Sequence, residues 1–490
     1  MVKSLTARSS ATRKNTIYYV NCLVSIGIMI LFHFLPTVGT LTRTGLDVMG
    51  IFVGIIYAFS TVDIIWPALL GIILLGTSEL YTMTGALTAA FGNDTWLFIL
   101  FVLAFATIIN DSGVSNIIAN WMVSRKFSRG KPWVISWLLM TTSYVIAALV
   151  SVTPGVIIPW SILYTMSDTY GYKQHDKYPA LMVIGITLAA LMGNSAFPFK
   201  AMAVMIQSAL YAQTGEVIDF WLFTILAVCL SYAVVMTYLL LCRFLFRPDV
   251  TPIKISDYVY SGETKLTGQQ KGIVGLLVAF CILLFAPGVL PATFPGITFL
   301  KSLGQTGTCV LLLCIAGVFV SRDSGKPVID LAQKFKNGTS WPTMMLMAFA
   351  MIMISAMTNE ATGIQPFLRE VFAPVFGSAP NAVLFIFIVC AVQMILTNVF
   401  ANLVIALLLI PLVCTYAPMV GASTVMMAVS VCVLTNVSLV FPSASPFAAL
   451  LHGNSEWVTA KEVYKYTSIT IVFVLFVATF ICATLGTLLF

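Results

Sequence analysis

The chain has 490 residues, of which 59% are hydrophobic and only 9% are charged. Soluble domains carry about 25% charged residues, so this composition excludes an ordinary soluble protein and predicts an all-α polytopic membrane protein. The formal net charge of +7 resides largely in predicted loops, which favours a role in membrane orientation over nucleic-acid binding.

The first predicted element is a membrane anchor at residues 17–35, within an N-terminal segment 1–45. Its apolar run is too long for the core of a cleavable signal peptide and lacks a small-residue cleavage site. Four basic residues precede it with no acidic residue nearby: Lys3, Arg8, Arg13 and Lys14. This bias predicts a cytoplasmic N-terminus in a cell membrane, inner or plasma. Further apolar runs predict ten to twelve spans in all.

Two later parts of the chain have similar patterns. Residues 46–246 and 272–490 are separated by a polar linker at 247–271. In each part a Gly- and Asn-containing segment ending in Trp, at 92–96 and at 337–341, opens a long helix. A shorter helix follows, then an apolar segment with a polar break, then a further span with a second break. This order predicts an internal repeat.

The loop charges predict that the two repeats are inverted. Four basic residues precede the first broken segment without an acid among them: Arg125, Lys126, Arg129 and Lys131. The equivalent place in the second repeat holds Glu360, Glu370 and Arg369. Since basic loops favour the cytoplasm, we expect the first hairpin to enter from the cytoplasm and the second from outside.

Four short polar patches interrupt the apolar runs, at 151–155, 193–198, 397–402 and 441–446. Lipid cannot satisfy freed backbone groups, so such patches persist only where protein buries them or where they line a watery cavity. Paired breaks in corresponding places are typical of the binding sites of transporters. We therefore predict that each repeat has a re-entrant helical hairpin, at the first patch of each pair, and a discontinuous helix, at the second.

The patches at 397–402 and 441–446 indicate possible ligand-binding groups more clearly than the first pair does. Backbone carbonyls and the side chains of Thr397 and Asn402 offer oxygen ligands to a small hard cation. Freed N–H groups at the start of the following half-helix would bind an anion. The alternative is a helix–helix contact through small polar residues. At 441–446, Pro442 and Pro446 flank Ser-Ala-Ser, so a helix cannot continue through them.

These patches carry a family resemblance. Residues 397–403, followed by Pro411, resemble the second Ser-Asn-Thr signature of the divalent anion/sodium symporters, which belong to the ion transporter superfamily of di- and tricarboxylate carriers. Ala401, Asn402 and Leu403 fill the three places of that signature.

The other patches match less closely. Ala444-Ser445-Pro446 resembles the small-Thr-Pro-Pro-Asn element of that family, and Gly193-Asn194 stands where two glycines are usual. Ser151-Val152-Thr153 lies near the first Ser-Asn-Thr signature but lacks its Asn. The resemblance runs from about Leu75 to the C-terminus.

The resemblance implies a scaffold domain that forms a homodimer and a transport domain that moves like an elevator. It implies Na⁺ as a coupling ion, with no other cofactor, and candidate sodium ligands at Ser151, Gly193, Thr397, Asn402 and Ala444. Asn398 is a further candidate from its place in the same polar patch. Candidate ligands of a small organic anion are Ser151, Thr153, Asn194, Ser195, Lys200, Asn402, Ser445 and Pro446.

The departures from the family pattern affect the expected strength of sodium binding. The first signature has lost its Asn and the second its hydroxyls, and fewer oxygen ligands mean weaker cation binding. The sequence therefore leaves open whether one or both sodium sites persist. Lys200 follows the first break directly, and charge at membrane depth is by default a functional hypothesis. It could replace the charge of a sodium ion, or it could extend to the lipid headgroups.

The predicted function is secondary active transport of a di- or tricarboxylate such as succinate, malate, citrate or 2-oxoglutarate, by ion-coupled symport or exchange. Sodium and proton coupling both stay open. An inorganic-anion carrier or a cation/proton antiporter of the same superfamily is the alternative, although both hairpin patches lack the carboxylates that antiporters need. A membrane-embedded enzyme requires converging catalytic groups, and the patches hold only hydroxyls, amides and backbone groups.

Overall fold

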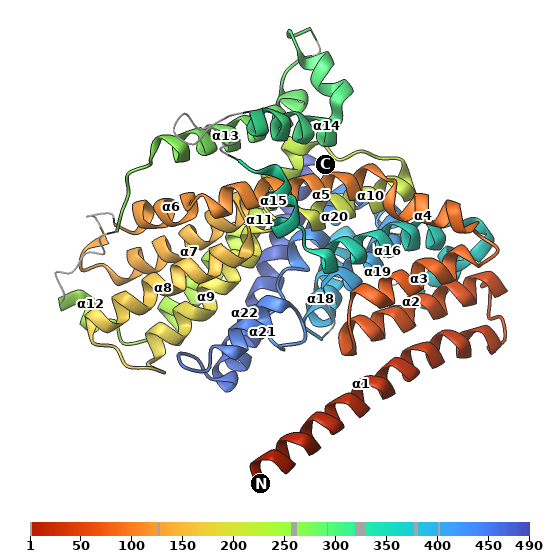
Figure 1. Ribbon diagram of the computed structural model, residues 1–490, viewed down its shortest axis with the longest axis horizontal. Coiled ribbons are helices and arrows are strands. Elements are labelled where there is room, and N and C mark those ends of the chain that lie inside the picture. The colour runs from red at the N-terminus through yellow and green to blue at the C-terminus, as the bar shows by residue number, and fades with distance from the viewer. Residues whose placement is uncertain are drawn as a thin grey trace. The chain divides into compact units, whose positions relative to one another are not determined.

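The structure is a computed structural model, and it describes residues 2–124, 128–255, 262–291, 293–318, 329–376, 381–399 and 402–490. Within these ranges every regular element is a helix (Figure 1). Nine of the described helices are long and apolar enough to cross a bilayer, and five further apolar helices have 10–17 residues. The prediction of an all-α polytopic membrane protein is confirmed.

The described helices fall into two series along the chain. The first series is α1 (Val2–Phe34), α2 (Arg43–Thr61), α3 (Ile65–Gly76), α4 (Met83–Phe91), α5 (Asp94–Asp111), α6 (Val114–Val123), α7 (Pro132–Leu149), α8 (Val152–Tyr170), α9 (Lys177–Gly193), α10 (Ala201–Thr214) and α11 (Phe220–Leu241). The second is α12 (Thr251–Ile255), α13 (Gly268–Val289), α14 (Ile297–Val318), α15 (Leu331–Gly338), α16 (Trp341–Thr358), α17 (Ile364–Phe376), α18 (Ala382–Val399), α19 (Asn402–Tyr416), α20 (Thr424–Leu434), α21 (Pro446–Gly453), α22 (Ala460–Ile481) and α23 (Thr487–Leu489).

The repeat runs from α5 to α11 and again from α16 to α22. Each copy has a long helix, a shorter helix, a pair of helices joined by a break, a second broken pair and a long final helix. Both final helices end in a π-helical turn, Cys242–Phe246 after α11 and Cys482–Gly486 after α22. The predicted internal repeat, with one hairpin and one discontinuous helix in each copy, is therefore present.

Polar side chains determine where the long apolar helices begin. Thr267 starts α13 and Thr459 starts α22, each with a reciprocal capping box. Asp219 caps α11 by accepting hydrogen bonds from two backbone N–H groups of its first turn. Such caps accept hydrogen bonds from backbone N–H groups that have no partner inside the helix. Leaving these groups without a partner near a bilayer costs free energy.

The chain divides into two compact units. Unit 1 comprises Met1–Leu97, Tyr211–Gly215 and Ser340–Ser378, and unit 2 comprises Phe98–Leu210, Glu216–Thr339 and Ala379–Phe490. Each unit thus draws on both repeats. The division of the chain into 1–45, 46–246, 247–271 and 272–490 follows the repeats and stays a prediction.

In unit 1, helix α1 packs along α2, and α16 packs against α2, α3 and α4. Hydrogen bonds join segments that are distant in sequence: the Tyr81 hydroxyl donates to Ser355 Oγ at 2.8 Å, and Trp96 Nε1 donates to Met344 O at 3.0 Å.

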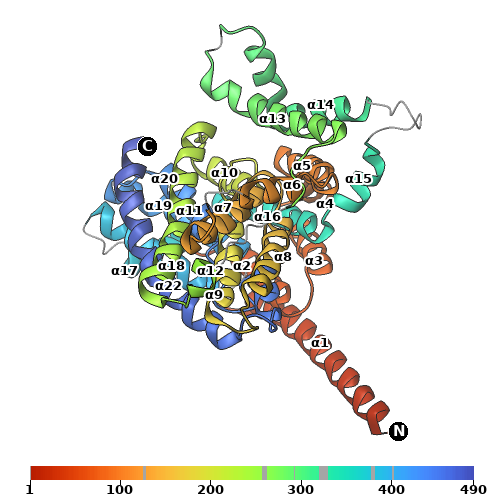
Figure 2. The same cartoon turned by 90° about the vertical axis from the view of Figure 1, so that its left-hand side faces the viewer.

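In unit 2, α7, α8 and α9 lie side by side (Figures 1 and 2). Every residue of α9 from Tyr178 to Gly193 is buried, as expected of a helix that is apolar all round. Helix α20 is also almost entirely buried. These two central helices each run directly into a break, and the breaks form the candidate site.

Candidate functional site

The first break separates α9 from α10 at residues 194–200. Its freed polar groups are bound locally. Ser195 is fully buried and its hydroxyl donates to Met192 O at 2.9 Å. Gln207 Nε2 donates to Pro198 O, also at 2.9 Å. Asn194 is half-buried and ends α9. The predicted discontinuity at 193–198 is confirmed.

The first hairpin consists of α7 and α8, which meet at Val150 and Ser151. Ser151 is extended and half-buried, and its hydroxyl does not cap α8. Thr153, in the first turn of α8, is exposed. Ser143 fixes the hairpin to the central helix, because its hydroxyl lies 2.7 Å from both Gly155 O and Ile186 O.

Gly193 lies where the central helix touches the first hairpin. A Cβ atom at this position would lie only 2.2 Å from the carbonyl oxygen of Tyr144 on α7. No side chain fits without moving one helix. Glycine at this place therefore permits close backbone packing between α9 and the hairpin.

The ammonium group of Lys200 caps the first arm of that hairpin. Its Nζ donates to Ala147 O at 3.0 Å and to Val150 O at 3.2 Å. These carbonyls belong to the C-terminal end of α7, where the helix dipole is negative. The Lys200 side chain is only 8% exposed and lies 5.9 Å from the centre of the Phe199 ring. The two ion pairs found among the described residues, His33–Asp47 and Lys334–Asp111, do not include Lys200.

The second break separates α20 from α21 and covers residues 435–445, so it begins six residues before the predicted patch at 441–446. Two side chains at its start bond to the preceding turn: Thr435 Oγ1 donates to Val431 O, and Asn436 Nδ2 donates to Cys432 O at 3.0 Å. Beyond them, released backbone groups find partners on α18. We call residues 435–445 the unwound segment.

Asn398, in the last turn of α18, holds the unwound segment with its side-chain amide. Its Nδ2 donates to Val437 O at 2.7 Å and to Met394 O at 2.8 Å. Its Oδ1 accepts hydrogen bonds from the backbone N–H groups of Leu439 at 3.0 Å and Val440 at 2.9 Å. The amide thus forms hydrogen bonds with three backbone groups that the break leaves without helical partners. Two of these bonds are to its oxygen, which therefore already has two donors.

Two neighbours on α18 extend this connection. The Thr397 hydroxyl donates to Thr435 O at 2.7 Å, and Gln393 Nε2 donates to Val431 O and to Thr435 Oγ1, each at 2.7 Å. Within the described chain, Gln393 Oε1 and Ser438 Oγ have no hydrogen-bond partner although both residues are fully buried. Buried polar atoms without a partner are rare, and a bound ion or water is a common reason for them.

The remaining predicted residues lie around the same segment. Ser445 donates to Ser438 O at 3.0 Å and caps α21, Ala444 is fully buried, and Pro446 is the exposed first residue of α21. Asn402 begins α19, with its Oδ1 3.5 Å from Thr397 Oγ1. Residues 400 and 401, including the predicted Ala401, lie outside the described residues.

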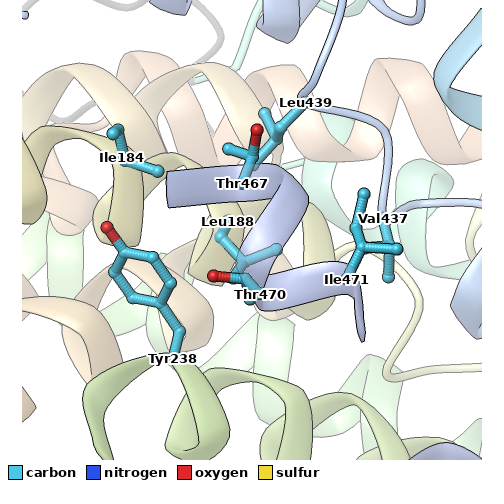
Figure 3. A pocket seen from close by; sticks show the side chains of 8 residues that line it. All are labelled: Ile184, Leu188, Tyr238, Val437, Leu439, Thr467, Thr470 and Ile471. Atoms are coloured by element: carbon cyan, nitrogen blue, oxygen red, sulfur yellow. The ribbon is translucent and has the colours of Figure 1, made fainter. Parts of the chain in front are cut away.

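A small cavity adjoins the unwound segment (Figure 3). Its lining comes from α9, α11, α22 and the segment itself: Ile184, Leu188, Tyr238, Val437, Leu439, Thr467, Thr470 and Ile471. None of these side chains is charged, so the cavity offers no ion-pair partner to a carboxylate. It does show that the segment packs against the central helix α9.

A family model for citrate transporters (CitMHS) matches residues 52–324, which is more than half of the chain. The chain belongs to the citrate transporter family. The matched range includes the first hairpin, the first break and Lys200, whereas the second hairpin and the unwound segment lie beyond it. As a member of this family the protein is a multi-pass membrane transporter.

Solved structures agree on the fold. The YdaH transporter of Alcanivorax borkumensis aligns with a TM-score of 0.58 at 12% identity, covering 91% of this citrate-family chain and 98% of its own. MtrF of Neisseria gonorrhoeae, reported to illuminate a class of antimetabolite efflux pumps, aligns with a TM-score of 0.54 at 13% identity, covering 79% and 80%. At these identities the likeness shows the fold. No protein of curated function matches the sequence.

Sequence reasoning missed Thr435, Ser438 and Gln393. A signal for the first was present, because the tripeptide Thr-Asn-Val occurs both at 397–399 and at 435–437. The contact of Gly193 with Tyr144 has no local signal, since it depends on the packing of α9 against α7.

Proposed function

We propose that this transporter carries a small organic anion, a di- or tricarboxylate such as citrate, succinate, malate or 2-oxoglutarate, by ion-coupled symport or exchange. The observation that carries the proposal is the buried ammonium of Lys200 at the first break. Two of its N–H groups are engaged by carbonyls of α7. The remaining one can donate to a substrate carboxylate, and a buried cation without an acidic partner favours an anionic ligand.

The same ammonium serves as a built-in cation of the first repeat. The carbonyls of Ala147 and Val150, next to the predicted sodium ligand Ser151, already accept hydrogen bonds from Lys200. A second cation beside it would be repelled. In our proposal Ser151, Thr153, Asn194 and Ser195 therefore surround the substrate, Gly193 provides close packing, and the first repeat needs no external sodium ion.

We place the external coupling ion, Na⁺, in the second repeat. Thr397, Asn402 and Ser438 offer oxygen atoms there, and Gln393 adds a buried oxygen without a partner among the described residues. Ala444 is fully buried and adds no polar side chain there. Asn398 holds the backbone instead of the ion, because its oxygen already has two donors. Ser445, Pro446 and Asn402 face the substrate in this arrangement.

The division into units supports an elevator mechanism. All elements of the two hairpins and the two breaks belong to unit 2, apart from the last turn of α10. In our proposal unit 2 moves through a cell membrane as the transport domain, and unit 1 is the scaffold of a homodimer. The inverted orientation of the repeats and the kinship with divalent anion/sodium symporters belong to the same proposal.

The test is uptake of labelled citrate, succinate and 2-oxoglutarate into proteoliposomes, with an inward sodium gradient, a pH gradient or neither. We expect sodium-stimulated uptake of at least one of these anions, and preloaded unlabelled substrate will reveal exchange. Labelled phosphate and sulfate test the inorganic-anion alternative. Absence of flux for every carboxylate, with protein that is folded and monodisperse, would refute the proposal.

A further inference from the structure

A groove in unit 1 includes none of the candidate site residues. It has a volume of about 480 Å³ and is formed by α1, α2 and α3, which pack in sequence (Figure 1). Ligand pockets commonly span about 300–1,000 Å³. The walls are apolar: residues between Ile26 and Phe34 on α1, Ile51 on α2, and Leu70 and Leu74 on α3.

The two ends of the groove differ. Beyond its apolar end a single side-chain contact bridges α1 and α3, in which Trp66 Nε1 donates to the Tyr18 hydroxyl at 3.2 Å. The other end is polar and is lined by His33, Asp47 and a Thr-Ser pair at 77–78. There the His33 ring donates from Nδ1 to Asp47 Oδ1 at 2.9 Å. The groove is therefore amphiphilic, with an apolar end and a polar mouth.

Charges of both signs surround this mouth. Arg43, at the start of α2, donates to His33 O in the last turn of α1 and, at 2.8 Å, to Leu35 O just after it. Glu79 lies just after α3 and accepts a hydrogen bond from Thr44 at 3.2 Å. Asp47 lines the mouth itself, so two carboxylates and one guanidinium lie in or beside it. A ligand with both an ammonium and a phosphate group complements this set.

The position and length of the groove match one bilayer leaflet. The mouth lies where α1 and α3 end and α2 begins, and Thr16–Phe34 of α1 is a candidate membrane span. At 1.5 Å per residue, the stretch from Ile26 to Phe34 is about 12 Å long. One leaflet of a hydrocarbon core of about 30 Å is about 15 Å deep.

We propose that this groove binds a membrane phospholipid with an amine-bearing headgroup, phosphatidylethanolamine. One acyl chain lies along α1 and α3, the ammonium contacts Asp47 and Glu79, and the phosphate faces Arg43. A helix from a second copy of the chain is a poorer occupant. A helix is about 10 Å across with its side chains, and the Tyr18–Trp66 hydrogen bond would have to break for such a helix to lie along α1 and α3.

The test is lipid retention by the purified protein, measured by native mass spectrometry after exposure to equal amounts of phosphatidylethanolamine, phosphatidylcholine and phosphatidylglycerol. Ile30→Trp fills the groove, and Leu31→Trp is the matched control, because Leu31 is 59% exposed on the same helix and does not line the groove. We expect wild type and Leu31→Trp to retain phosphatidylethanolamine preferentially. Ile30→Trp should bind it at least about tenfold more weakly, and Asp47→Asn should lose the preference over phosphatidylcholine.

Retention by Ile30→Trp equal to that of wild type would overturn the proposal, as would equal binding of the three lipids by wild type. A change from dimer to monomer in Ile30→Trp with unchanged lipid binding would assign the groove to a second copy. If Ile30→Trp fails to fold, photo-crosslinking supplies the answer: a lipid with a photoreactive acyl chain must label residues 26–34 of the wild type. Transport is not measured, so these outcomes are independent of the proposed function.

Discussion

Lys200 Nζ lies 3.0 Å from the carbonyl oxygen of Ala147, although 53 residues separate the two along the chain. The bond joins the first discontinuous helix to the first hairpin and places a positive charge at the hairpin's break. The Lys200 side chain joins the two elements by bonding to carbonyl oxygens, as a bound metal ion would. Unlike a metal ion, it is covalently part of the chain and cannot dissociate.

Replacing Lys200 tests this assignment. Lys200→Gln keeps a hydrogen-bond donor but removes the charge, so we expect KM for the anion to rise at least about tenfold, the loss of one charge-assisted contact. Lys200→Arg keeps the charge and should retain part of the affinity. The measurement is concentration-dependent uptake into proteoliposomes. An unchanged KM in Lys200→Gln would show that the ammonium neither binds substrate nor replaces an ion.

Gly193→Ala tests the contact between α9 and the hairpin. Its Cβ would lie 2.2 Å from Tyr144 O, so one helix must shift, and overpacking of this kind destabilises by about 1–3 kcal/mol. Gly275→Ala on α13 is the control, because nothing lies within 4 Å of its Cβ. It should be neutral or slightly stabilising. Thermal unfolding in detergent measures both, and equal midpoints would contradict the prediction.

Asn398 offers a graded test of the unwound segment. Asn398→Asp keeps the acceptor for Leu439 and Val440 but loses the bonds to Val437 O and Met394 O, whereas Asn398→Leu loses all of them. Each buried group left without a partner costs about 1–3 kcal/mol. We expect hydrogen exchange at the Leu439 and Val440 amides to be fastest in Asn398→Leu. Equal protection in the wild type and both variants would rule out the holding role.

Cysteine labelling tests the predicted orientation. Ser128 is buried, so Arg129, which is exposed, is the better position for a reporter cysteine. We expect Arg129→Cys to react only from the cytoplasmic side and Val217→Cys, at an 80% exposed position between α10 and α11, only from outside. Native Cys229 and Cys314, both exposed, are first replaced. Labelling of Arg129→Cys from outside would reverse the topology.

Much of this architecture is readable in the sequence, because lipid tolerates so few backbone arrangements. Gly193 and Pro198 identify the first break, and the proline pair at 442 and 446 identifies the end of the second. The start of the second break was not predicted, because Thr435 and Asn436 offer no glycine or proline signal, and the second Thr-Asn-Val tripeptide at 435–437 does not by itself indicate a break. The bonds that α18 makes to this segment depend on the fold.

The hydrogen-bond partners of the site residues could not be predicted from the sequence either. The depth of Lys200 follows from its apolar neighbours, but its carbonyl partners on α7 depend on how α10 folds back. Asn398 was predicted to be an ion ligand from its place in a polar patch. Its contacts to Leu439 and Val440 arise from the packing of α18 against the unwound segment, which only the three-dimensional arrangement shows.

The bonds of Asn398 also restrict how the second hairpin can open. They attach α18 to the unwound segment, and the hydrogen bonds of Gln393 and Thr397 to Thr435 strengthen this attachment. A motion that preserves these bonds carries α18 and the segment as one body, which leaves α19 as the arm that swings. A disulfide engineered between α18 and the segment would then leave turnover intact, whereas one between α19 and α20 would stop it.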